Sequence, residues 1–389
     1  MKLISIGFTT LILTLTGCGG DSGGAANLAN DSCSDLNSDA FNCEQMLQDI
    51  TAVASNNVDT LVTDLTQLDT DIVSYCDVQD TASLNTAKAQ WLVVMANVQQ
   101  LEVMQFGLIE GARDNFYNWP LNDSCRLDVQ IASAPLEDFD TVSNSRRGLN
   151  AVEYILFKPE VLASCASQFS AISTWQSDNT SAEQKLARCE YAKRISADLV
   201  VTATELKAEL VNYDITSEFT SLQAAANSIS DALFYIDKQT KDAKIRDVLP
   251  QESTGVFSAN LLESQFALVS KTHLKNNLIG AKAILQAGLN DYLIASGQQS
   301  IATEMILTLD NAITNIDAIS GNMNTAITGA SEASACINNA ANGTYDGSSD
   351  IQSICALQFN IKEFTDILKF EFAQTLSFIR PAIADGDND

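Results

Sequence analysis

The chain has 389 residues, 46% of them hydrophobic, and a formal net charge of −27. A length of this order accommodates roughly one or two domains with a sizeable core. The large excess of acidic groups repels the phosphates of nucleic acid and anionic lipid headgroups. It therefore argues against both as partners, and it draws cations toward the surface.

The first residues predict export. Lys2 supplies a positive charge, and the apolar run from Leu3 to Leu15 is too short to span a bilayer, as in a secretory signal. The sequence Leu-Thr-Gly-Cys that ends at Cys18 resembles the lipobox of bacterial lipoproteins, in which the cysteine is acylated and becomes the first mature residue. The resemblance implies a lipid anchor on the periplasmic side of the outer membrane, because Gly19 rather than Asp follows the cysteine. Ordinary secretion, with Cys18 merely near the cleavage site, is the alternative.

The remaining cysteines predict disulfides. Removing Cys18 from the nine cysteines leaves an even set, which in an exported protein favours four disulfides. A metal cluster is the alternative, but the sequence contains no Cys-x-x-Cys pair. About a hundred pairings are possible. Proximity in the sequence favours the pairs Cys33–Cys43, Cys76–Cys125, Cys165–Cys189 and Cys336–Cys355.

Apolar residues recur at helical spacing along most of the chain, which has only five prolines and shows no strand-like alternation of useful length. The spacing predicts helices over 44–75, 81–111, 144–157, 183–213, 216–240, 260–297, 299–328 and 352–379. Breaks are predicted at Trp119-Pro120, at a linker over 249–255 and at a loop over 342–347. These elements predict an all-α protein with two antiparallel helical bundles, split near residue 250.

The expected organisation has five parts. They are a signal peptide over 1–17, a lipidated tether over 18–43, an N-terminal bundle over 44–249, a C-terminal bundle over 250–380 and an acidic tail over 381–389. No later segment has the length and apolarity of a membrane-spanning helix, so the lipid is expected to be the only attachment to the membrane.

Two carboxylates stand out because they project onto apolar helix faces. Glu102 projects onto the same face as Trp91, and Glu153 projects between apolar neighbours with Asn150 one turn before it. Burying a carboxylate costs several kcal/mol unless a cation or hydrogen-bond donors compensate it. Inward carboxylates on separate helices are typical of metal sites in helical bundles. Alternatively Arg146, two turns from Glu153, neutralises it in a buried ion pair.

Several stretches resemble the imelysin-like family, which includes the insulin-cleaving membrane protease and iron-regulated protein A. Residues 148–157 look like the Gly-x-His-x-x-Glu signature of that family. Residues 91–107 are similar to its aromatic-then-Glu-Phe-Gly helix, and Trp119-Pro120 falls where its members commonly have Trp-Pro. Residues 270–280 resemble its second-half helix, and together the matching stretches cover roughly residues 45–375.

The resemblance implies an all-helical, two-bundle periplasmic protein that is linked to uptake of iron or another metal and whose proposed ligands are the His and Glu of the motif. Glu153 stands at the Glu position, but Asn150 replaces the His. An imidazole suits iron, zinc and copper, whereas an amide oxygen suits calcium and magnesium. The site has therefore either changed the metal ion that it prefers or lost its ability to bind metal. His273, the sole histidine, is either an accessory ligand or a solvated residue between two lysines.

The sequence leaves three functions open for this chain. The first is a non-enzymatic, membrane-tethered binding protein connected with metal-uptake components, in which Glu153, Asn150 and Glu102, with His273 as accessory, hold a divalent or ferric ion of undetermined identity. The second is a peptidase. A zinc hydrolase needs about three protein ligands, and the sequence has neither His-Glu-x-x-His nor Gly-x-Ser-x-Gly. The third is a scaffold or partner-binding lipoprotein with an extinct metal site, in which Arg146 or backbone donors hold Glu153.

Overall fold

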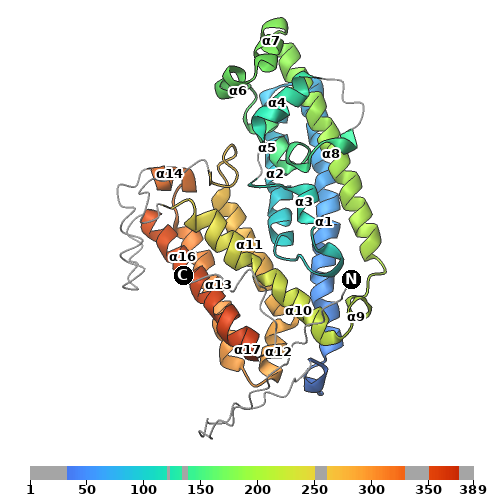
Figure 1. The fold of residues 1–389 in the computed structure, drawn as a ribbon, viewed down its shortest axis with the longest axis vertical. Coiled ribbons are helices and arrows are strands. Elements are labelled where there is room, and N and C mark those ends of the chain that lie inside the picture. Colours follow the sequence, from blue (N-terminus) through green and yellow to red (C-terminus); the bar gives the residue numbers. More distant parts are fainter. Residues whose placement is uncertain (1–32, 121–122, 134–138, 250–260, 329–349, 376–389) are drawn as a thin grey trace, which may run out of the picture.

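The computed structural model describes residues 33–120, 123–133, 139–249, 261–328 and 350–375 (Figure 1). The predictions that lie outside these residues concern the signal peptide over 1–17, Cys18, most of the linker over 249–255 with the split near residue 250, the loop over 342–347, Cys336 and the tail over 381–389. Within the described ranges, none of the helices combines the length and the apolarity needed to cross a membrane.

The N-terminal half is built around three long helices. α1 lies along both α2 and α8, and shorter helices cover one end of this layer (Figure 1). The elements are η1 (Cys33–Leu36), α1 (Cys43–Val78), α2 (Thr81–Leu101), η2 (Gly107–Ile109), α3 (Arg113–Phe116), α4 (Ser124–Ala132), η3 (Phe139–Thr141), η4 (Asn144–Arg146), α5 (Leu149–Phe157), α6 (Ala163–Gln168), α7 (Ser170–Asp178) and α8 (Ser181–Leu210).

Side-chain caps define the ends of the long helices. The Asn42 side chain accepts a hydrogen bond from a backbone N–H in the first turn of α1, and Asp80 does the same for α2. Thr180 and Glu183 form a capping box at the start of α8. Each cap satisfies backbone donors that a helix leaves unpaired at its N-terminus.

The C-terminal half forms a second bundle. α13 packs against α16, while η5 packs against α16 and α11 (Figure 1). Two helices, α9 (Ile215–Glu218) and α10 (Leu222–Leu233), pack against α1 and lead into this bundle. Its elements are the π-helix η5 (Ile236–Arg246), α11 (Ser270–Ile284), the π-helix η7 (Leu285–Leu289), α12 (Asn290–Ala295), α13 (Gln299–Ala318), α14 (Met323–Thr328), α16 (Asp350–Asp366), the π-helix η8 (Ile367–Phe372) and α17 (Ala373–Thr375).

The two halves meet where α2 packs against α11. A Cβ atom added to Gly280 of α11 would lie 2.8 Å from the backbone oxygen of Gln100 on α2. Only a residue without a side chain allows two helix backbones to approach so closely. This approach brings the last turn of α2 into reach of the polar side chains of the second bundle.

The all-α prediction is confirmed, since no strand occurs among the described residues and the helices form two bundles. Several predicted helices are wrong in extent. Those over 144–157, 216–240 and 299–328 are each divided into shorter elements. Two further differences have a clear local cause. The helix predicted over 81–111 ends at Leu101, where the Gln105 side chain donates to the Leu101 carbonyl at 2.7 Å. The helix predicted over 260–297 begins only at Ser270, because Ser264 and Leu268 adopt left-handed backbone conformations with φ of 54° and 60°.

The disulfides differ in part from the pairing by sequence proximity. Cys33–Cys43 is confirmed. The predicted pairs Cys76–Cys125 and Cys165–Cys189 are wrong, because the bonds are Cys76–Cys189 and Cys125–Cys165. The reason is that α1 and α8 lie side by side, which brings residues 113 positions apart in the sequence to a Cα–Cα distance of 5.4 Å. Cys355 is also disulfide-bonded.

The end of the predicted tether is folded in this structure. Cys33 is fully buried, and its disulfide to Cys43 holds η1 at the start of α1. Phe41 stacks on Tyr292 of α12 with ring centroids 5.5 Å apart. The residues from Cys33 onward therefore belong to the packed body.

Candidate functional site

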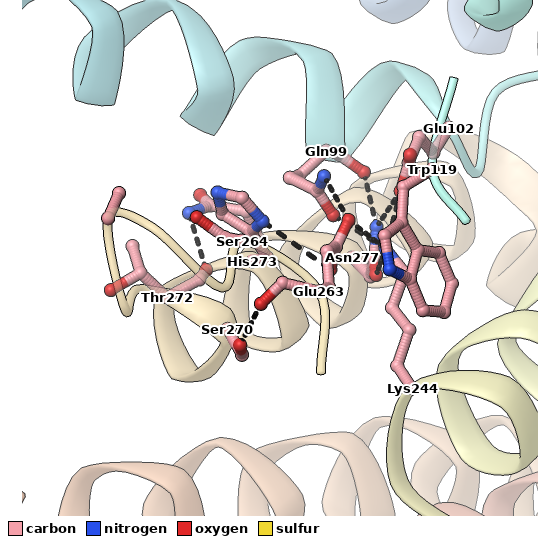
Figure 2. A network of polar contacts seen from close by, with 12 residues as sticks. Gln99, Glu102, Trp119, Lys244, Glu263, Ser264, Ser270, Thr272, His273 and Asn277 are labelled. Carbon is pink, nitrogen blue, oxygen red and sulfur yellow. Dashed lines mark hydrogen bonds and ion pairs between the residues drawn. The ribbon is translucent and has the colours of Figure 1, made fainter. Parts of the chain in front are cut away.

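Polar and charged side chains converge between the two bundles, where α2 meets α11 (Figure 2). We call this group the polar centre. It consists of Gln99, Glu102, Arg113, Lys244, Glu263, His273 and Asn277. These residues come from α2 and its C-terminal end, α3, η5, the segment before α11, and α11 itself.

The Lys244 ammonium is surrounded by oxygen atoms. Its Nζ lies 2.7 Å from Oε2 of Glu102 and 3.1 Å from Oε1 of Glu263. It also donates to the side-chain oxygens of Gln99, at 2.8 Å, and Asn277, at 2.9 Å. The Lys244 side chain is only 1% exposed. A buried ammonium is tolerated when carboxylates and hydrogen-bond acceptors compensate its lost hydration, as they do here.

Glu102 faces inward as predicted and is completely buried. Its Oε1 lies 3.1 Å from Nε of Arg113, and its Oε2 accepts from both Lys244 and the Asn277 amide, the latter at 3.0 Å. Two internal cations therefore balance the carboxylates of Glu102 and Glu263. A metal ion at Glu102 would have to compete with both Lys244 and Arg113.

Glu153 is also buried, at 1% exposure, so its predicted inward orientation is confirmed. Its Oε1 accepts from the Ser264 hydroxyl at 3.0 Å and from the backbone N–H groups of Phe266, at 3.0 Å, and Ala267, at 2.9 Å. Burial raises the pKa of Glu153, although these donors and His273 act in the opposite direction. Backbone donors thus hold this carboxylate.

The neighbours of Glu153 differ from the two sequence predictions. Arg146 does not neutralise it, because the Arg146 guanidinium donates to the Gln130 side chain at 3.0 Å. The Asn150 amide nitrogen donates to the Ser145 carbonyl at 2.8 Å. The Asn150 Oδ1 is buried and has no hydrogen-bond partner among the described residues. The Asn150 amide thus links the first turn of α5 to η4.

His273 lies inside the protein, so the expectation of a solvated histidine is wrong. Its side chain is 1% exposed, and Nδ1 lies 3.4 Å from Oε2 of Glu263. Burial on its own raises the pKa of Glu263, but the Lys244 ammonium and His273 outweigh it and lower that pKa to about 2. The Glu263 carboxylate is therefore ionised at neutral pH.

Several polar atoms beside this pair have no hydrogen-bond partner in the described part of the chain. They are Oε2 of Glu263, both ring nitrogens of His273 and the Tyr117 hydroxyl. The rings of Tyr117 and His273 are nearly perpendicular, with centroids 6.1 Å apart. Burial, followed by the negative charges of Glu263 and Glu153, raises the pKa of Tyr117 well above its ordinary value, which keeps its proton in place. Buried polar atoms without partners are rare, and they mark a place for water, an ion or a ligand.

The ligands predicted from the sequence do not form one metal site. Glu102 is paired with internal cations, Asn150 is bonded to Ser145, and Glu153 accepts donors from the segment before α11. Across the described ranges, no group of three or more His, Cys, Asp or Glu side chains is placed to hold a metal ion. In the described part of the chain, buried oxygen and nitrogen atoms without a hydrogen bond remain on Glu263, His273 and Tyr117, and Oδ1 of Asn150 is also without a partner.

Sequence reasoning did not identify two residues of this site, Glu263 and Lys244. Glu263 fell within a predicted helix, and no pattern distinguished it from a surface acid. Lys244 lay beyond the predicted end of the helix over 216–240, whereas η5 continues to Arg246. The charged residues of η5 could have been a signal, because several of them are buried. The spacing of apolar residues alone, however, does not reveal that a charged helix is buried.

The comparisons with known proteins agree on one family. The family model described as Imelysin (Peptidase M75) matches residues 54–351. An imelysin-like protein from Psychrobacter arcticum 273-4 has a similar crystal structure, with a TM-score of 0.61 and 13% sequence identity, over 87% of this chain and 97% of that one. A protein from Parabacteroides distasonis ATCC 8503 described as an iron-regulated protein A precursor is similar with a TM-score of 0.59 and 15% identity, over 85% and 96% of the two chains. No curated protein matches the sequence significantly. At these identities the two structures support the fold alone.

Proposed function

Because this chain belongs to the imelysin family, we propose that it is a non-enzymatic binding protein of the cell envelope that takes part in metal-ion uptake. A lipid on Cys18 would tether it to the periplasmic side of the outer membrane. The lipobox-like sequence supports the anchor, and a structural relative described as an iron-regulated protein A precursor supports the link to iron. The non-enzymatic role is supported by the donor set of the described residues, in which no group offers the three or so protein ligands that a zinc hydrolase uses.

One observation carries the proposal: the His273 imidazole and Oε2 of Glu263 lie 3.4 Å apart, buried between the bundles, and neither has a hydrogen-bond partner among the described residues. Imidazole and carboxylate are ligands that iron and zinc accept. We propose that these two side chains are the protein ligands and that water supplies the rest. His273 would then provide the imidazole that the family motif places at Asn150, from the other bundle.

Metal analysis of the tag-free full chain tests this proposal. We expect about one equivalent of iron or zinc after loading, and loss of that metal in His273→Gln and in Glu263→Gln. Glu304→Gln removes an exposed carboxylate of α13 and should leave the metal content unchanged. Circular dichroism verifies that each variant is folded. Failure of the wild type to retain metal, or retention by folded His273→Gln, would exclude this site.

The alternative is a scaffold or partner-binding lipoprotein whose metal site is extinct. The observation that favours it is the complete internal pairing of Glu102 together with the backbone donors on Glu153. In that case the metal analysis returns no bound ion, and the unpaired atoms of His273 and Glu263 are hydrated. The same experiment therefore separates the two functions.

A further inference from the structure

A cavity of about 610 Å³ lies outside the polar centre, at the junction of α10 and η5. Its walls come from α10 and η5, from the segment around η2 and from the segment before α10. This volume falls in the range of small-molecule sites and is larger than a bare metal ion needs. Tyr235 belongs to its wall, and the Lys244 Nζ lies 5.5 Å from the centre of the Tyr235 ring.

The charge of the cavity is negative. Glu110 and Asp231 both line it. Both side chains are exposed, but partial burial of Asp231, followed by repulsion from Glu110, raises the pKa of Asp231 to about 6. Lys238 also lines the cavity, but its Nζ lies 3.4 Å from Asp237 and 3.8 Å from Asp242. Because carboxylates of its own helix neutralise Lys238, Glu110 and Asp231 set the charge that a ligand meets.

Three aromatic residues form part of the remaining wall, beside small and polar side chains. Phe219, Phe234 and Tyr235 line the cavity, and the amide and hydroxyl of Asn227 and Ser228 lie among them. Aromatic faces attract cations and also accommodate hydrocarbon. Two neighbouring carboxylates against aromatic side chains are therefore complementary to a molecule with a positive end and an apolar body.

We propose that this cavity binds a small alkylamine, with its ammonium group between Glu110 and Asp231 and its carbon chain against Phe219 and Phe234. Such a ligand would relieve the repulsion between the two carboxylates. A hydrated metal ion would leave the aromatic walls without a partner. The cavity would thus give this protein a ligand distinct from the ion of the polar centre.

Calorimetric titration of the tag-free full chain in detergent with 1,5-diaminopentane tests the proposal at about 0.15 M salt, where long-range attraction is screened. We expect saturable binding that weakens about tenfold in Asp231→Asn and in Glu110→Gln, the usual effect of losing a charge-assisted hydrogen bond. Asp291→Asn removes an exposed carboxylate of α12 with the same change in net charge and should alter the affinity less than about twofold. Equal weakening in all three variants would instead show general attraction to an acidic protein and overturn the proposal.

Two further measurements examine the walls and the charge. 1-Aminohexane should bind more tightly than ammonium ion, and equal affinities would contradict the role of the aromatic side chains. Diamine affinity should fall as the pH drops through about 6, because protonation of Asp231 removes one of its two partners. Metal content should be unchanged in Asp231→Asn, so failure of this proposal is distinguishable from failure of the metal site.

Discussion

Two clusters of buried charge differ in how completely their atoms are paired. In the N-terminal half, Arg188 of α8 forms an ion pair with Asp128 of α4 and donates to the Lys158 carbonyl at 2.7 Å. The Tyr154 hydroxyl completes this cluster by donating to Asp128 at 2.6 Å. Among the described residues, Nε of Arg188 is the single atom of this cluster without a partner.

The polar centre contains more charge and leaves more of it unpaired. Lys244 is saturated, whereas His273, Glu263 and Tyr117 retain buried atoms without hydrogen bonds in the described ranges. The Asp128 cluster lies within one half and holds α4 against α8. The polar centre joins both halves. Buried charged groups whose polar atoms all have partners indicate a structural role. Buried polar atoms that lack hydrogen bonds next to such charges are the better sign of a binding site.

The largest expected effect is that of Lys244→Met. This change leaves Glu102 and Glu263 without their shared cation in a buried site, which should lower the free energy of unfolding by about 3–5 kcal/mol. Urea denaturation measures it. Lys275→Met is the matched control, because its ion pair with Asp317 lies at the surface and should contribute at most about 1 kcal/mol. Similar losses in the two variants would show that the polar centre is no more important than a surface pair.

Arg188→Met should have the next largest effect, a loss of about 3 kcal/mol, because one carboxylate rather than two loses its cation. Arg126→Met, which breaks a largely exposed pair with Asp123, serves as control for the urea measurement. The metal content and diamine affinity of Arg188→Met should remain those of the wild type. Loss of either ligand in this variant would contradict the separation between the two clusters.

A smaller effect is expected in acid. The pKa of Glu263 is lowered from 4.5 to about 2 in the folded protein, so its contribution to stability is complete above pH 4.5 and is lost as the pH falls toward 2. Glu263→Gln should therefore show a shallower decline of the urea midpoint over this range than the wild type. Glu304→Gln, an exposed acid, should follow the wild type. Parallel declines in all three proteins would contradict the low pKa.

Sequence reasoning recovered the long helices, such as α1 and α8, because their apolar spacing is local information, but it predicted none of the short helices α4, α6 and α7. The inward orientation of Glu102 and Glu153 was also predictable, since each interrupts an apolar face. The partners of these carboxylates were not predictable. Lys244, the partner of Glu102, comes from the other bundle. The donors to Glu153 come from the segment before α11, where residues with left-handed backbone conformations prevent a helix from forming. Such pairings depend on how distant segments pack.

The dependence of pairing on how distant segments pack also explains why the predicted disulfide pairs were only partly correct. Proximity in the sequence identified Cys33–Cys43, where the chain turns directly into α1. It failed for Cys76, whose partner is set by the alignment of α1 with α8 rather than by loop length. An even cysteine count predicts that bonds form, whereas the fold decides which cysteines meet.

The smallest effect we predict concerns the contact that brings the polar centre together. Gly280 faces the backbone of Gln100, so the Cβ of Gly280→Ala would force α11 away from α2 and lower the free energy of unfolding by about 1–2 kcal/mol. The sign is diagnostic, because alanine within a helix is otherwise favoured over glycine by about 1 kcal/mol. Urea denaturation should show a further loss for Gly280→Ser, whose side chain is larger. Stabilisation by Gly280→Ala would show that the two helices can separate without cost, and the polar centre would then not depend on their close approach.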